Sequence, residues 1–143
     1  MSEKKYLHPN VFKYIEHELY NYTTSKRELA NIREEILESS ASQEVCVQST
    51  PSSSVESKVV KLTSSVAIAK IERVILAVDR SLVRLKDDHQ MLFDLKYKQG
   101  RSWQQVCIDM PCSESSCYNI RRELVFAVAD ALGFIFLEKP PKR

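Results

Sequence analysis

The sequence is poor in glycine and in histidine. Only Gly100 and Gly133 occur in its 143 residues, so no glycine-rich loop is available to cradle a phosphate group. The three histidines, His8, His17 and His89, are scattered along the chain, and no serine lies in the sequence pattern of a nucleophile elbow. We therefore expect no catalytic residues, no cofactor and no enzymatic activity.

Long apolar runs are also missing. No stretch of 18 apolar residues is present, so we expect no membrane span. The N-terminal residues Met-Ser-Glu-Lys-Lys-Tyr lack the apolar region of a secretory signal, which predicts a cytoplasmic protein whose cysteines stay reduced. Cys107, Cys112 and Cys117 follow one another at intervals of five, unlike the closer pairs of a zinc knuckle. Because Cys107 and Cys117 fall on predicted buried faces, we expect no bound metal.

The pattern of what is present predicts an all-α fold. Hydrophobic residues make up 43% of the chain, and few segments alternate as strands do. Both glycines fall where predicted helices end. We expect an N-terminal helical region (1–38), a flexible Ser-rich linker (39–57), a long connecting and oligomerisation helix (58–86), a helix-turn-helix domain (87–137) and a basic tail (138–143).

The N-terminal region carries two apolar stripes at helical spacing. Between them, Asn21 and two threonines are poor helix formers, and Ser25 with Glu28 forms a capping-box pattern. We therefore expect two helices that meet near residues 22–25. Core packing or a helical hairpin explains the stripes most simply, and a dimer seam is the alternative. The stripes consist of Phe12, Ile15, Leu19 and Tyr22, and of Leu29, Ile32 and Ile36.

Residues 39–57 hold eight serines and few apolar residues, a composition that buries too little surface to order the chain. The helix predicted after this linker is about 40 Å long at roughly 1.5 Å per residue. Its apolar stripe is longer than a small C-terminal domain can cover, so we expect a homodimer or higher oligomer. The expected contact residues are Leu62, Val66, Ile71, Ile75, Val78 and Leu82.

Residues 102–132 have the pattern of a helix-turn-helix. Ser102 and Gln105 form a capping box, Pro111 ends the first helix, and Ser113 caps the second. The second helix has an apolar face, which predicts that it packs against the rest of this unit. Trp103 is expected to insert into the core of the same unit. That apolar face consists of Cys117, Ile120, Leu124, Val128 and Leu132.

The polar face of the same segment predicts a DNA-binding surface. The second helix of such a motif enters the major groove with its N-terminal residues first. Residues 96–122 carry five Lys or Arg against two Asp or Glu, a net charge of +3 that phosphate contact would require. We expect DNA contacts from Arg101, Ser102, Gln104, Ser113, Glu114, Ser115, Ser116, Tyr118, Asn119, Arg121 and Arg122.

The stretch Leu-Phe-Asp-Leu-Lys-Tyr-Lys-Gln-Gly-Arg-Ser-Trp-Gln-Gln-Val at 92–106, with residues 113–116 and 121–124, resembles region four of bacterial sigma factors. The whole chain resembles the RinA/ArpU-type phage transcriptional activators, through residues 18–22, 55–59 and 131–135. Pro111 and Cys112 replace the usual Gly-hydrophobic turn, and Cys117 replaces an aliphatic residue. The resemblance implies a phage or prophage activator of late genes for packaging, morphogenesis or lysis, acting on DNA in a bacterial host.

A second class of function stays open at this point. The same helical surface would also suit a protein-interaction module that binds host RNA polymerase or a sigma factor without specific DNA binding of its own. A mobility shift on bare DNA, compared with a pull-down on polymerase, separates the two hypotheses.

Overall fold

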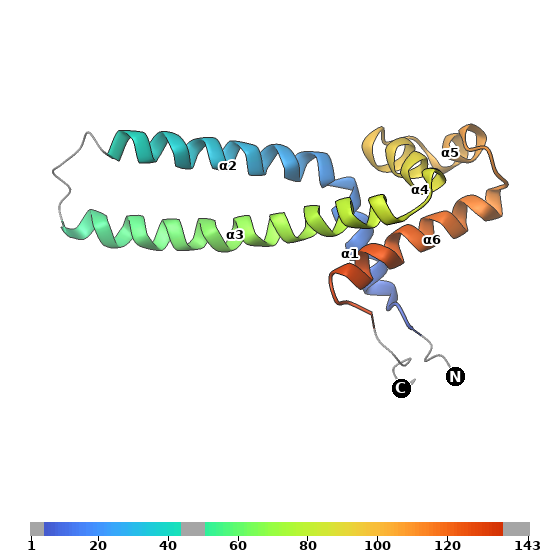
Figure 1. The fold of residues 1–143 in the computed structure, drawn as a ribbon, viewed down its shortest axis with the longest axis horizontal. Helices are drawn as coiled ribbons and strands as arrows, with labels where there is room; N and C mark the ends of the chain where they lie inside the picture. Colours follow the sequence, from blue (N-terminus) through green and yellow to red (C-terminus); the bar gives the residue numbers. More distant parts are fainter. Residues whose placement is uncertain (1–4, 44–50, 136–143) are drawn as a thin grey trace. The chain divides into compact units, whose positions relative to one another are not determined.

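The computed structural model describes residues 5–43 and 51–135, with side chains placed over 5–38 and 65–135 (Figure 1). Every element of these described residues is helical, which confirms the all-α fold. None of their helices is long and apolar enough to cross a membrane. The elements are α1 (Pro9–Tyr20), α2 (Tyr22–Gln43), α3 (Pro51–Arg84), α4 (Asp87–Leu92), the π-helix η1 (Phe93–Lys98), α5 (Trp103–Asp109) and α6 (Glu114–Ala131).

The chain divides into two compact units, and the first is discontinuous in sequence. It contains residues 1–23 and 76–143, so α1 belongs with the C-terminal helices, where it contacts α6 and η1. The second unit contains residues 24–75. This division differs from the predicted one, which kept residues 1–38 together and treated 58–86 as one separate segment.

The second unit is a helical hairpin. Its α2 segment and the first part of α3 run antiparallel in Figure 1, and Arg33 of α2 forms an ion pair with Glu72 of α3. Residues 39–43 end α2 and residues 51–57 begin α3, so the prediction of a flexible linker was wrong over both segments. A proline at the first position of α3 explains its early start, because proline needs no helical N–H there. The rest of that linker, 44–50, lies outside the described residues, as does the predicted basic tail.

The core of the first unit is built by side chains from distant parts of the sequence. Ile15 and Leu19 of α1 are 0% and 1% exposed, which places one apolar stripe of this helix inside the unit. Aromatic side chains extend the core, with Tyr22 and Phe93 in an edge-to-face contact at 5.3 Å between ring centroids. The largest fully buried side chains of this unit also include Leu92, Leu124, Val78, Val106, Val125 and Val128.

A break at one residue separates α1 from α2. Pro9 is the first residue of α1, and His8 caps it by accepting a hydrogen bond from the Asn10 N–H at 3.0 Å. The helix ends at Tyr20, and α2 begins at Tyr22 after Asn21. The expected capping box at Ser25 is therefore wrong, because Ser25 lies inside α2. The Asn21 side chain instead forms a hydrogen bond with the His17 ring, which satisfies a polar group of each side chain at this break.

Both glycines end helices with positive φ, as predicted. Gly133 has φ +80°, and its N–H donates to the Asp130 carbonyl while the Phe134 N–H donates to the Ala129 carbonyl. These two bonds form a Schellman motif at the end of α6. Gly100, with φ +69°, follows η1, where the wider π-helical turns bury Phe93, Leu95 and Tyr97. Leu92, the residue just before η1, is buried as well.

Candidate nucleic-acid interface

The helix-turn-helix consists of α5, the turn at residues 110–113 and α6. The Ser102 hydroxyl accepts a hydrogen bond from the Gln105 N–H at 3.2 Å, and the Ser113 hydroxyl accepts one from the Ser116 N–H at 3.3 Å. Both predicted N-caps are therefore present. The Gln105 side chain donates through Nε2 to the Asp109 carboxylate. The two caps fix where each helix of the motif begins.

The turn itself follows from the proline. Met110 adopts an extended conformation, with ψ 139°, as expected for a residue that precedes proline. Its side chain is 4% exposed and joins Val106 under α6. The predicted apolar face of α6 is buried throughout, with exposures from 0% to 8%. This packing fixes which side of α6 faces outward.

The outward side of α6 carries polar residues over its first turns. Glu114, Ser115, Asn119 and Arg122 are exposed, and Ser116 is half-buried. On α5, Gln104 and Ile108 are exposed, and Ile108 is 75% exposed despite being aliphatic. A pocket of about 390 Å³ lies between the two helices. Its lining residues are Trp103, Gln104, Cys107, Ile108, Glu114 and Tyr118.

Trp103 lies at the edge of the core. It is half-buried, so the expectation of a core wedge was wrong. Its ring is 5.7 Å from that of Tyr118 and 4.8 Å from the Arg121 guanidinium. The Lys96 ammonium lies 5.0 Å from the same ring. Through these cation–π contacts, the indole at the start of α5 links Arg121 of α6 with Lys96 of η1.

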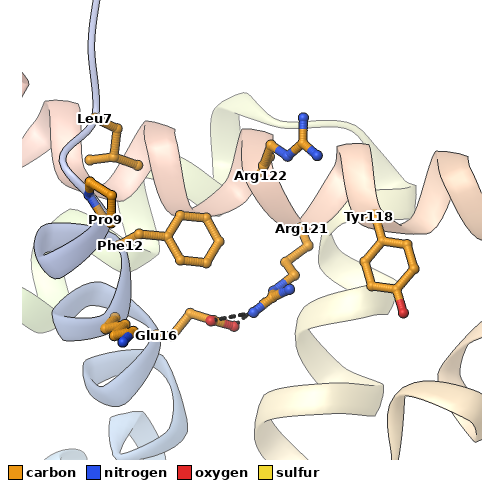
Figure 2. Close-up of a pocket in the computed structure, with 8 residues that line it drawn as sticks. Leu7, Pro9, Phe12, Glu16, Tyr118, Arg121 and Arg122 are labelled. Atoms are coloured by element: carbon orange, nitrogen blue, oxygen red, sulfur yellow. Dashed lines mark hydrogen bonds and ion pairs between the residues drawn. The ribbon is translucent and has the colours of Figure 1, made fainter. Parts of the chain in front are cut away.

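Arg121 is directed into the protein (Figure 2). Its Nε and Nη2 atoms donate to the two carboxylate oxygens of Glu16, at 3.0 and 2.5 Å. The guanidinium also lies 5.1 Å from the Phe12 ring, and its bonds to Glu16 raise its pKa. Glu16 accepts a further hydrogen bond from the Tyr97 hydroxyl at 2.8 Å. This side chain, predicted as a DNA contact, instead links α6 to α1.

Apart from Arg122, the other basic groups between residues 96 and 122 also have partners within the protein. Arg101 forms an ion pair with Asp109, and hydrogen bonds from Gln105 and then Arg101 lower the pKa of that carboxyl. Lys96 donates to the Arg101 carbonyl at 2.9 Å, and burial lowers its pKa. Lys98 pairs with Asp94 at 3.6 Å. These contacts reduce the free positive charge that the sequence count suggested.

Arg122 is the exception. Figure 2 shows it pointing away from Arg121, on the outward side of α6. Among the described side chains it has no hydrogen-bond or ion-pair partner. It also lines a pocket of about 550 Å³ between α1 and α6, together with Leu7, Pro9, Phe12, Lys13, Glu16, Tyr118 and Arg121. Arg122 is therefore the arginine of this surface best placed to contact a ligand.

Glu16 and Phe12 are the residues of this site that sequence reasoning missed. Positions 12, 15, 16 and 19 share one face of a helix, so Glu16 lies on the apolar stripe of α1. A carboxylate on an apolar stripe needs a buried partner. That placement signals a long-range ion pair, although it does not identify Arg121.

The expected oligomerisation residues do not form one open face. Ile75 is 8% exposed and Val78 is 0% exposed within the single chain. Ile71 and Leu82 are half-buried, and Val66 is 65% exposed. The Leu62 side chain lies outside the described ones. Substituting Val78 would therefore disturb the fold of the chain itself.

No group of three or more His, Cys, Asp or Glu side chains among the described residues is arranged to hold a metal ion. Residues 6–130 match a family model described as "Protein of unknown function (DUF722)". The match covers most of the chain, so the protein belongs to this family. Searches of curated proteins and of solved structures gave no match.

Proposed function

We propose that this member of DUF722 is a sequence-specific regulator of transcription that binds double-stranded DNA through α6. The observation that carries the proposal is the outward side of α6. Four exposed polar residues, Glu114, Ser115, Asn119 and Arg122, occupy its first turns, and buried apolar residues fix their direction.

The chemistry of these side chains suits the edges of base pairs in the major groove. Arginine donates two hydrogen bonds to guanine, asparagine pairs with adenine, and a carboxylate accepts from the cytosine amino group. Ser115, Asn119 and Arg122 are spaced at i, i+4 and i+7, so they follow one line along α6. Ile108 on α5 offers an apolar contact of the kind that thymine methyl groups make.

The charge distribution limits how this protein would bind phosphates. Since Lys98, Arg101 and Arg121 are paired with carboxylates, few of the basic residues between 96 and 122 are free for the DNA backbone. Each phosphate contact contributes about −0.9 to the slope of log K against log salt. We therefore expect a shallow salt dependence, with base contacts supplying much of the affinity.

The resemblance to phage activators supports a role in late-gene activation, for packaging, morphogenesis or lysis, inside a bacterial host cell. The residues that carry it are 18–22 at the end of α1 and the start of α2, 55–59 in α3, and 131–135 at the end of α6. The polar surface of α6 alone fits a repressor equally well, so the sign of regulation depends on this resemblance.

We further propose that the active form is a homodimer or higher oligomer. One helix-turn-helix reads few base pairs, whereas a symmetric dimer reads two half-sites about one helical turn apart. In the hairpin unit, Leu37 is 70% exposed, Val66 is 65% exposed and Ile36 is 44% exposed. These exposed apolar side chains would suit contact with a second copy of the hairpin. They replace Ile75 and Val78, which are buried, as the proposed contact residues.

The alternative is a module that binds RNA polymerase or a sigma factor. Ile108, which is 75% exposed, offers a partner protein an apolar contact at this surface. Selection from random DNA with the purified full-length chain distinguishes the two functions. A recovered consensus that gives a mobility shift supports the first proposal. Recovery of no consensus, together with retention on purified polymerase, would support the alternative.

A further inference from the structure

Two thiols are in contact at the turn of the helix-turn-helix, and the proposed function does not use them. Cys112 lies in the turn and Cys117 lies in α6, with their Sγ atoms 3.5 Å apart. Ser113 is the N-cap of α6, so Cys112 precedes the cap and Cys117 is the fourth residue of the helix. Apolar side chains at these two positions often pack together as a hydrophobic staple. Here the staple consists of two sulfur atoms.

The two thiols differ in their access to solvent. Cys117 is 0% exposed, and burial together with the contact to Cys112 raises its pKa to about 12. Cys112 is only half-buried, so a reagent from solvent meets this sulfur first. Cys107 of α5 is also half-buried and lies close enough to affect Cys117. Cys107 is therefore the competing partner that an experiment must exclude.

We propose that Cys112 and Cys117 form a reversible oxidation site, at which a hydroperoxide converts the two thiols into a disulfide. A disulfide bond is about 2.05 Å long, so the sulfur atoms must approach by roughly 1.5 Å. The two sulfur atoms are already in contact before any oxidation. Because the proposal concerns the thiols alone, it does not depend on DNA binding.

The reaction consumes one hydroperoxide and needs no other reactant. The Cys112 thiolate attacks one peroxide oxygen, the O–O bond breaks, and the leaving oxygen departs as water after taking a proton. Cys112 is then a sulfenic acid. The Cys117 sulfur attacks the Cys112 sulfur, the S–O bond breaks, and that oxygen leaves as water with the Cys117 proton. With hydrogen peroxide, two thiols and one peroxide yield one disulfide and two waters.

The resulting bond would close a short loop around the N-cap of α6. Ser113, Glu114, Ser115 and Ser116 lie inside that loop. The disulfide would therefore constrain the part of α6 that presents the outward polar residues. A thiol reductant would reverse it.

The test uses the full-length chain, reduced and then treated with hydrogen peroxide. Iodoacetamide in denaturant counts the remaining thiols, and we expect the four cysteines of the chain to fall to two and to return to four with dithiothreitol. Cleavage after both Asp109 and Glu114 places Cys107, Cys112 and Cys117 on three different peptides, so the mass spectrum shows which two the disulfide joins. Four reactive thiols after peroxide treatment, or a bond that joins Cys117 to Cys107, overturns the proposal.

Two serine variants provide the matched comparison. Cys107→Ser should still lose two thiols, whereas Cys112→Ser should lose no pair to an intramolecular disulfide at the same peroxide concentration. Equal oxidation of the two variants would contradict the assignment. Circular dichroism checks that each variant keeps its helices. If Cys112→Ser does not fold, the peptide map of Cys107→Ser decides the partner.

Discussion

Glu16 and Arg121 form a two-point ion pair across 105 positions of the chain. Their side chains are 13% and 26% exposed, so water weakens the pair only partly. The Tyr97 hydroxyl donates to the same carboxylate, which joins α1, η1 and α6 at one point. Arg121 therefore supports the position of α6, and its neighbour Arg122 remains available on the surface.

Replacing Glu16 by glutamine should destabilise the first unit. The change removes the charge that balances Arg121, and a part-buried charge that loses its partner costs roughly 1–3 kcal/mol. Denaturant unfolding followed by circular dichroism measures the loss. Glu34→Gln, at an exposed position of α2, is the control and should change the free energy of unfolding by less than about 0.5 kcal/mol. Equal stability of both variants would show that the ion pair contributes little.

Arg122→Ala should weaken specific DNA binding while leaving the fold intact. Loss of one bidentate arginine–guanine contact costs roughly 1–3 kcal/mol, or about 5- to 160-fold in Kd. A mobility shift on the selected DNA site measures this. Arg27→Ala, which removes an exposed arginine from the hairpin unit, should leave Kd unchanged. A wild-type Kd for Arg122→Ala would place the binding surface elsewhere.

Alkaline pH should destabilise the protein through Tyr97. Burial, followed by the negative charge of Glu16, raises the pKa of this phenol above its ordinary value of 10.0. The folded state therefore keeps the proton that the unfolded state loses. The resulting stability is present below about pH 10 and is lost as pH rises further, by up to about 1.36 kcal/mol per pH unit.

Tyr97→Phe tests this origin, because it keeps the ring and removes the titrating hydroxyl. Urea unfolding at several values between pH 9 and 11 should show a shallower loss of stability in the variant. Parallel curves for both proteins would assign the alkaline effect to other groups. At pH 7 the variant also loses the hydrogen bond to Glu16, so the slopes must be compared rather than the absolute values.

Gly133→Ala should cost about 1 kcal/mol, because its φ of +80° is unfavourable for a residue with a Cβ atom. A Cβ atom at this position would contact nothing within 4 Å, so the cost comes from the backbone alone. Gly133→Asn should cost less, because asparagine tolerates the left-handed region. Thermal unfolding of the two variants measures the order, and equal stability would contradict a backbone cause.

Leu37→Glu with Val66→Glu should shift the proposed oligomer towards monomer without unfolding it. Both side chains are largely exposed within one chain, so a charge there disturbs only an interface between copies. Light scattering at micromolar concentration reports the mass. Val83→Glu, at an 82% exposed site of the first unit, is the control and should keep the wild-type mass. A wild-type chain of monomer mass would exclude the oligomer at this concentration.

Local signals explain how much of this fold the sequence predicted. Ser102, Ser113 and Gly133 act on residues within one turn of themselves, and each begins or ends a helix where the pattern indicated. The buried face of α6 follows from helical periodicity in the same way. Serine-rich composition was a poorer guide, because it concealed the helical start of α3 at Pro51.

Long-range relationships could not be obtained in this way. The position of Glu16 on the apolar stripe of α1 signals a buried partner, but nothing in the neighbouring sequence identifies that partner as Arg121. The local sequence also does not predict the π-helix at residues 93–98, because its wider turns depend on what Phe93 and Tyr97 pack against. Four of the five basic residues counted for DNA proved to have internal partners, so net charge overstated the cationic surface.

The split of the first unit around the hairpin has a consequence for synthesis on the ribosome. Helix α1 is synthesised well before α6, because Arg121, the partner of Glu16, follows it 105 residues later. At about 5–20 residues per second, this interval lasts roughly 5–20 s. During it, the apolar stripe of Ile15 and Leu19 has no α6 to pack against. The apolar stripe of α1 is therefore exposed in the nascent chain until α6 has been synthesised.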